Sequence, residues 1–114
     1  MMDATSLAED WIAGFNAHDL TRILAHYHED VVLNSPIAAR LTGHARVEGK
    51  EALAAYFKLG LQRAPELKFT LIEVLPGANS LCIRYHSNFG NNTACECMEV
   101  GSDGRIVRVL CHYA

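Results

Sequence analysis

The sequence predicts a single α+β domain in which helices cover one face of a mainly antiparallel sheet, and three observations lead to this expectation. The chain has 114 residues, half of them apolar, which is enough for one core and too little for two ordinary domains. In the first half, apolar residues recur at intervals of three and four, as they do on helices. From residue 66 onward, four β-rich runs alternate with short segments of Gly, Pro, Asn and Asp, as in a meander of strands.

The first helix is expected from the stretch SLAEDWIAGF. Ser6 and Glu9 have the three-residue spacing of a capping box, in which each side chain satisfies a free amide at the helix start. Leu7, Trp11 and Phe15 then form one apolar stripe that can face a core. A break is expected at residues 16–19.

Two further helices are expected before the strands begin. Asp19 can cap a second, shorter helix, whose apolar positions are Leu20, Ile23, Leu24 and Tyr27. The helical period returns over residues 50–64, where Pro65 stops it because proline cannot continue a helix. Three helices therefore precede the strand-rich half.

The remaining segments are expected to form strands and one loop. The run VVLNSP at 31–36 predicts a short strand that Pro36 ends or leaves at a sheet edge. Residues 37–49 follow neither period and contain two glycines, so a loop or irregular edge is expected. Four strands follow within 67–75, 80–89, 93–100 and 105–114, and the turns PGAN, GNN and GSDG join them into an antiparallel meander.

Charge and composition exclude several kinds of partner. Ten basic against thirteen acidic residues give a net charge of -3, and the basic residues are scattered, so no nucleic-acid partner is expected. The start of the chain lacks the basic flank and apolar run of a secretion signal, and no stretch approaches the ~20 apolar residues of a membrane span. We expect a soluble, cytoplasmic protein that does not associate with membranes.

The four cysteines are expected to be reduced thiols, since no secretion signal is apparent. Cys95 and Cys97 are poor disulfide partners, because same-face neighbours on a strand lie about 6.6 Å apart at Cα, near the upper limit for a bridge. The pairs HYH, CEC and CH offer metal-binding side chains, but none has the two-residue spacing of a zinc knuckle. No metal, no cofactor and no catalytic cysteine are expected.

The stretch TACECMEV raises the question of which glutamate faces the core. Alternate strand residues share a face, so Glu96 groups with Ala94 and Met98, while Cys95, Cys97 and Glu99 take the other side. A glutamate that faces an apolar pocket has a raised pKa, because its charged form loses hydration. The alternative is that Glu96 hydrogen-bonds a backbone group or Arg108 near the sheet surface.

The order of elements and three segments resemble the nuclear transport factor 2-like superfamily, which includes ketosteroid isomerase and the SnoaL-like polyketide cyclases. The segments are WIAGFNAHDLTRILAHYHEDVVLNSP, GKEALAAYFKLGL and GSDGRIVRV, and the resemblance covers nearly the whole chain. It implies a cone-shaped fold in which a strongly curved sheet wraps around a long helix and encloses an apolar cavity. It also implies a homodimer, which we expect to form through the outer sheet face, because RVLCHY carries apolar residues on both faces.

The resemblance assigns roles to individual positions. Glu96 falls where the isomerases place a buried carboxylic acid that stays protonated. Ser35 takes the place of the isomerase base, but a hydroxyl cannot remove a proton from carbon unless another base activates it. Trp11 takes the place of a tyrosine and cannot act as a phenol. Steroid isomerisation by that mechanism is therefore not expected.

A second cavity acid is considered at Glu73, which shares strand parity with Phe69 and Leu71; it can equally sit where the strand turns outward. Tyr85 rather than His86 is expected to face inward. Asn34 and Ser35 lie at the pocket mouth if they bind ligand, or cap the turn before Pro36.

The catalytic candidates are therefore Glu96, Ser35 and Glu73, and the ligand-binding candidates are Trp11, Phe15, Tyr27, Asn34, Tyr56, Phe57, Phe69, Leu71, Tyr85, Met98, Val109 and Cys111.

Two functions are open at this point. One is a small isomerase-, cyclase- or hydrolase-like enzyme that uses acid-base chemistry on a hydrophobic carbonyl or cyclic molecule, with Glu96 as the acid. The other is a non-catalytic ligand-binding or dimerisation module with the same fold. The fold supports many chemistries, so the sequence does not name the substrate.

Overall fold

The computed structural model describes residues 3–114, and the chain alternates between helices and strands in its first half before it becomes purely β. The elements are α1 (Ala4–Asn16), α2 (Leu20–Leu24), β1 (Tyr27–Asn34), α3 (Pro36–Thr42), β2 (Arg46–Glu48), α4 (Lys50–Arg63), β3 (Phe69–Gly77), β4 (Ser80–Ser87), β5 (Asn92–Val100) and β6 (Ile106–Tyr113).

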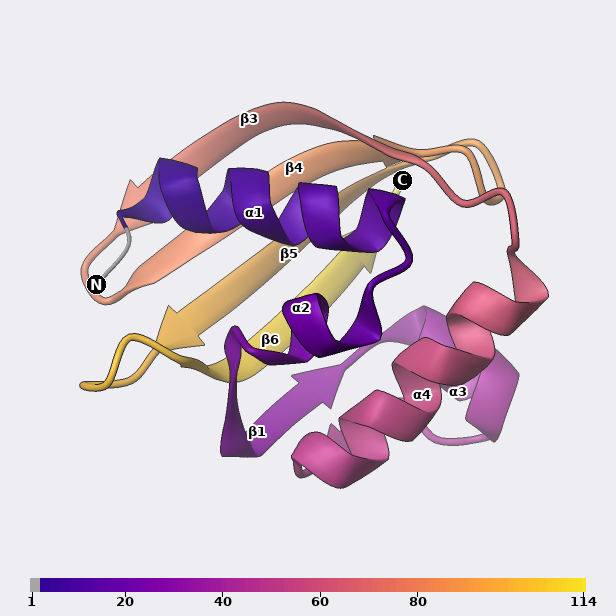
Figure 1. Cartoon of the computed structure of the whole chain (residues 1–114), viewed down its shortest axis with the longest axis horizontal. Coiled ribbons are helices and arrows are strands. Elements are labelled where there is room, and N and C mark those ends of the chain that lie inside the picture. Colours follow the sequence, from indigo (N-terminus) through magenta and orange to yellow (C-terminus); the bar gives the residue numbers. More distant parts are fainter. Residues whose placement is uncertain (1–2) are drawn as a thin grey trace.

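All six strands form one sheet in the order β2-β1-β6-β5-β4-β3. The expected meander of β3 to β6 is confirmed, because each of these strands pairs antiparallel with the next. β1 runs parallel to β6, which is possible because a long crossover, and not a hairpin, connects them. The sheet bends strongly (Figure 1). It is open, with β2 and β3 as its two edge strands.

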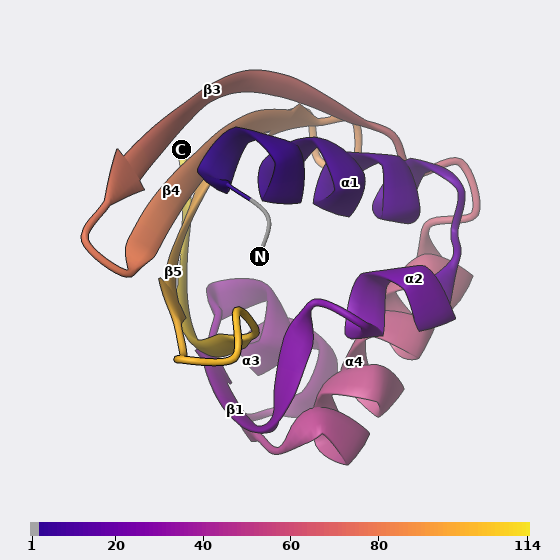
Figure 2. The ribbon, with the colours of Figure 1, turned by 60° about the vertical axis from the view of Figure 1, so that its left-hand side comes forward.

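The helices lie on the concave side of the sheet, so the expected α+β class and cone shape are confirmed. Figure 2 shows β3 and β4 arching over α1, while α3 and α4 lie toward the β1 end of the sheet. α1 packs against β3 and β4, and α4 packs against β1 and α2. None of the helices in residues 3–114 is both long enough and apolar enough to cross a membrane.

The predicted helix starts are partly right. The Asp19 cap is confirmed, since its carboxylate accepts a hydrogen bond from the Arg22 amide at 3.1 Å. The Ser6–Glu9 capping box is wrong: α1 begins at Ala4, and the Asp3 carboxylate accepts from the Ser6 amide at 2.8 Å. The cap must have extended backbone just before the first turn, and Asp3 has it, whereas Ser6 is already helical.

The expected loop at 37–49 contains regular structure. Pro36 opens α3 as its first residue, where a missing amide proton costs nothing, and Gly43 ends it with a φ of 85°. β2 then pairs with β1, with Val47 opposite Leu33. Residues 3–114 therefore contain four helices in place of the three expected. Tyr27, expected on the second helix, instead begins β1.

The expected third helix is α4, which ends at Arg63 and so agrees with the sequence to within one residue. At the centre of the core, Trp11 is fully buried and donates a hydrogen bond from Nε1 to the Tyr27 hydroxyl at 2.8 Å. Its ring lies 5.7 Å from Phe69 and 5.3 Å from Tyr85, between ring centroids. This aromatic cluster joins α1 to the inner face of the sheet.

Candidate functional site

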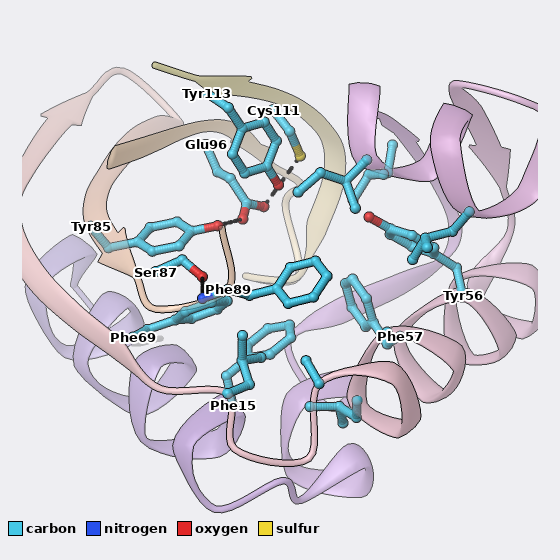
Figure 3. A pocket seen from close by; sticks show the side chains of 17 residues that line it. Phe15, Tyr56, Phe57, Phe69, Tyr85, Ser87, Phe89, Glu96, Cys111 and Tyr113 are labelled. Atoms are coloured by element: carbon cyan, nitrogen blue, oxygen red, sulfur yellow. Dashed lines mark hydrogen bonds between the residues drawn. The ribbon is translucent and has the colours of Figure 1, made fainter. Parts of the chain in front are cut away.

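A pocket lies between the inner face of the sheet and α1, α3 and α4, with a cavity volume of about 80 Å³. Its wall is largely apolar and aromatic, with contributions from Phe15, Phe57, Phe69 and Phe89 (Figure 3). One water needs roughly 10–15 Å³ by the same kind of measure, and pockets for drug-sized ligands measure about 300–1,000 Å³. The cavity as it stands therefore has room for a few waters or for part of a small organic molecule.

Glu96 of β5 supplies the one carboxyl among the described residues that line this pocket. It lies in register between Ile83 of β4 and Cys111 of β6, and only 5% of its surface is exposed. Figure 3 shows its carboxyl held between Tyr85 and Cys111 and facing a group of aromatic rings. The inward orientation expected from strand parity is therefore what the structure has.

The hydrogen bonds of Glu96 come from side chains of the two neighbouring strands. The Tyr85 hydroxyl donates to Oε2 at 2.6 Å, and the Cys111 thiol donates weakly to Oε1 at 3.4 Å. Burial raises the pKa of Glu96 because it removes water from the charged form, while the two hydrogen bonds act in the opposite direction.

No ion pair with Glu96 forms among residues 3–114. The alternative partner considered from the sequence, Arg108, instead lies on the outer face, 3.9 Å from Glu99. That alternative is wrong, because Arg108 has the strand parity of the exposed face. Glu96 is thus a buried acid without a compensating cation from this part of the chain.

The other polar groups of the pocket are hydroxyls and one thiol. Burial, and then the nearby Glu96 carboxyl, raise the pKa of Tyr85 and Tyr113, and burial raises that of Tyr56. Burial and Glu96 also raise the pKa of the Cys111 thiol. These groups are therefore neutral donors and acceptors near neutral pH, and Cys111 lacks the thiolate character of a nucleophile.

Ser35 is buried at the first turn of α3, where its hydroxyl accepts hydrogen bonds from the Ile37 amide at 3.1 Å and the Ala38 amide at 3.4 Å. Of the two roles considered for Ser35, the capping role is therefore confirmed. The segment that it caps is the start of the helix α3 at Pro36, and not an isolated turn. Neither Ser35 nor the half-buried Asn34 belongs to the pocket wall. A base at the position of Ser35 is absent.

Glu73 does not face the pocket, so the expectation of a second cavity acid there is wrong. The pairing of β3 with β4 shifts by one residue between Leu71 and Glu73. This bulge turns Glu73 to the outer face, where its carboxylate lies 3.3 Å from Arg84 and both side chains are about half exposed.

The expected ligand-binding residues divide into two groups. The pocket wall contains Phe15, Tyr56, Phe57, Phe69, Tyr85 and Cys111. The wall does not contain Trp11, Tyr27, Asn34, Leu71, Met98 and Val109. Met98 and Val109 show the reason. Both face inward and are buried, but they pair with each other at the next inward-facing position along the strands from the pair of Glu96 and Cys111. The alternation of side chains along a strand predicts which face of the sheet a residue lies on, but not whether it reaches the pocket.

Several wall residues were not predicted. Tyr113 shares the face of Cys111, and Ser87 shares that of Tyr85, so the same parity could have found both. Ile37 and Leu41 lie one turn apart on α3, in a segment expected to be a loop. The remaining wall residues are Leu33, Gly60, Leu61, Ala64, Leu67 and Phe89.

Chemically, the site offers one carboxyl and several neutral hydroxyls around an apolar space. A protonated carboxyl in such a place can donate a hydrogen bond, or a proton, to an acceptor oxygen as charge develops on it. No histidine or second carboxyl lines the wall among residues 3–114. A reaction that needs a separate base must therefore use water or a group of the substrate.

Comparison with known proteins gives a family and a fold. A model of the SnoaL-like domain family matches residues 8–109. The solved structure of a SnoaL-like protein of unknown function from Burkholderia thailandensis is 37% identical, covers 97% of this chain and 94% of that chain, and superposes with a TM-score of 0.91. No functionally curated protein matches the chain.

More distant solved structures share the fold alone. A candidate ketosteroid isomerase from Kribbella flavida is 20% identical over 96% of this chain and 76% of that chain, with a TM-score of 0.75. A candidate polyketide cyclase from Sinorhizobium meliloti is 14% identical over 94% of each chain, with a TM-score of 0.78.

Proposed function

Because the chain belongs to the SnoaL-like domain family, we propose that its pocket binds a small hydrophobic molecule and that Glu96 is the acid of an acid-base reaction on it. The observation that carries the proposal is a carboxyl only 5% exposed, at the wall of an apolar cavity, with no cation from residues 3–114 beside it. Such an environment favours the protonated acid.

Tyr85 orients this acid. Its hydroxyl donates to Oε2 at 2.6 Å, so the proton of the neutral acid resides on Oε1, next to the weak Cys111 donor. From there it hydrogen-bonds a carbonyl or ether oxygen of the bound molecule and transfers as negative charge develops on that oxygen. Isomerase- or lyase-like chemistry on a compact carbonyl or cyclic compound fits this arrangement.

The size and composition of the wall limit the substrate. A cavity of about 80 Å³ accepts a steroid only if the wall residues move, since pockets for drug-sized ligands measure about 300–1,000 Å³. The Ser35 hydroxyl is already used by the α3 cap. Substrates that supply their own proton acceptor, or that react with water, therefore fit better than those that need an enzyme base.

The test combines a titration with a screen for turnover. A carboxyl-carbon NMR titration should give Glu96 a pKa above that of an ordinary glutamate, and E96Q should abolish turnover of any compound that the wild type converts. E99Q is the matched control, since Glu99 lies on the same strand but on the exposed face. An ordinary pKa for Glu96, or full turnover by E96Q, contradicts the proposal.

The alternative function is a non-catalytic binding module, and the lack of a histidine or a second carboxyl in the described wall favours it. It predicts that E96Q binds the same ligand with nearly unchanged affinity and that no compound is converted by either protein. Loss of a measurable turnover in E96Q, with ligand affinity retained, excludes this alternative.

We also propose that two copies of the chain associate through the outer sheet face. Leu75, Cys82, Cys97 and Leu110 follow one another in register across four strands. Leu75 is 53% and Leu110 is 37% exposed, and an apolar row of this kind favours a partner. Sedimentation equilibrium should give a dimer at micromolar concentration, and L110E should shift it to a monomer; a wild-type monomer contradicts the proposal.

A cytoplasmic location is proposed from the state of the cysteines. All four are free thiols in the structure, as is typical of proteins in a reducing compartment. Cell fractionation of a tagged chain tests this, and recovery outside the cytoplasm contradicts it.

A further inference from the structure

Three thiols gather on the outer face of the sheet, away from the pocket. Cys82 of β4 pairs directly with Cys97 of β5, and Cys95 lies two residues earlier on the same face of β5. All three sulfurs lie within 4.8 Å of one another, and the Cys82 and Cys97 sulfurs are 3.0 Å apart. Each side chain is only partly buried in a single copy of the chain, so solvent and ions can reach the cluster before two copies associate.

We propose that Cys82, Cys95 and Cys97 together bind one soft metal ion, with Zn²⁺ as the reference ion. A zinc–thiolate bond is about 2.3 Å long, so tetrahedral coordination by one ion places two sulfurs about 3.8 Å apart. The sulfurs lie between 3.0 Å and 4.8 Å apart, so each separation needs to change by at most about 1 Å, which small side-chain rotations can supply. Thiolates select zinc and other soft ions over Mg²⁺ or Ca²⁺.

Binding replaces three protons with the ion. Each sulfur loses its proton to solvent as its bond to the metal forms, and no oxidant or reductant is consumed. Without a cation, the neighbouring Cys97 raises the pKa of the Cys82 thiol, and burial raises that of Cys95. Both effects favour the protonated thiols. A divalent cation between the sulfurs favours the deprotonated form instead, because it stabilises the thiolates.

The surroundings leave a fourth position open. His112 of β6 lies opposite Cys95 on the same face and is exposed, so its imidazole or a water can complete a tetrahedral site. Arg84, which lies opposite Cys95, and Arg108 of β6 are each paired with an acid, Arg84 with Glu73 and Arg108 with Glu99.

The test uses the reduced full-length protein in a phosphine reductant, titrated with Co²⁺ and then with Zn²⁺. One Co²⁺ per chain should produce intense thiolate-to-cobalt charge-transfer bands, and Zn²⁺ should displace it. The variant C82S/C95S/C97S should lose these bands and at least about 100-fold in zinc affinity, since losing even an outer-shell partner costs about 10–100-fold. C111S, which changes the cysteine on the pocket side, should keep these bands and the wild-type affinity for zinc.

A second measurement needs no variant. Zn²⁺ should slow alkylation of the three outer cysteines by iodoacetamide, read residue by residue by mass spectrometry, and should leave the rate at Cys111 unchanged. Any one of four results overturns the proposal. These are wild-type zinc affinity in the folded triple variant, no charge-transfer bands with Co²⁺, binding of half an ion per chain, and equal alkylation rates with and without Zn²⁺.

Discussion

Changing Tyr85 to Phe removes the stronger hydrogen bond of a buried acid without creating a large cavity. Tyr85 is 1% exposed, and its hydroxyl donates to Glu96 Oε2 at 2.6 Å. The remaining donor to this carboxyl is the Cys111 thiol, at 3.4 Å from the other oxygen. In Y85F, Oε2 therefore has no hydrogen-bond partner unless a water enters.

The expected cost depends on the charge of Glu96. A hydrogen bond between neutral groups contributes about 1 kcal/mol to stability, and one to a charged group about 1.5–3 kcal/mol. The Tyr85 bond lowers the pKa of Glu96, so its loss raises this pKa further. The difference in free energy of unfolding between wild type and Y85F should thus be about 1 kcal/mol at pH 4 and grow to as much as about 3 kcal/mol once Glu96 ionises.

The assay is urea unfolding at a series of pH values, followed by circular dichroism. Y113F is the matched control, because Tyr113 also lines the pocket but is not a hydrogen-bond donor to Glu96; its effect should vary less with pH. In the background of E96Q, the pH dependence of the Y85F effect should disappear. A Y85F effect that is constant from pH 4 to pH 9 would refute the reasoning.

Three further predictions concern stability. The pKa of Glu96 is raised in the folded state, and the unfolded chain therefore releases this proton first. The wild type should lose stability as pH rises from the unfolded pKa of about 4.3 through the folded pKa. E96Q should remove this pH dependence in urea melts, and an unchanged pH dependence would contradict a raised pKa for Glu96. S35A should cost about 1 kcal/mol through loss of the α3 cap, while S35N should retain most of it; equal thermal midpoints for all three proteins would speak against the cap. W11F should lower the free energy of unfolding by at least about 1–3 kcal/mol, because the buried Tyr27 hydroxyl loses its donor. E73Q changes an exposed ion pair and should stay within about 0.5 kcal/mol of wild type. Comparable losses of stability in both variants would show that burial is not the cause.

Local patterns in the sequence determined much of the fold. The period of Leu7, Trp11 and Phe15 predicted α1, and the turn residues predicted the meander, because both depend on backbone preferences within a few residues. Strand parity placed Glu96 on the inner face for the same reason: alternation within one strand needs no knowledge of its neighbours. Whether that carboxyl does chemistry stays a prediction.

Other features depended on contacts between distant segments. A one-residue shift in strand pairing turned Glu73 outward, and pairing with β1 gave residues 46–48 the strand structure that their own pattern did not predict. The absence of the buried Met98 and Val109 from the pocket wall likewise follows from how the helices pack on the sheet, and not from parity.

The sequence by itself determined which residues share a face, and the tertiary structure decided which faces and residues meet. Cys95 and Cys97 were visible as a pair in the sequence, but only the register of β4 with β5 brings Cys82 to within 3.0 Å of Cys97. In the same way, only packing against α1 and α4 leaves Glu96 at a cavity instead of under a side chain. The physical reason is that backbone periodicity acts over a few residues, whereas register and cavities result from the balance of many contacts across the whole domain.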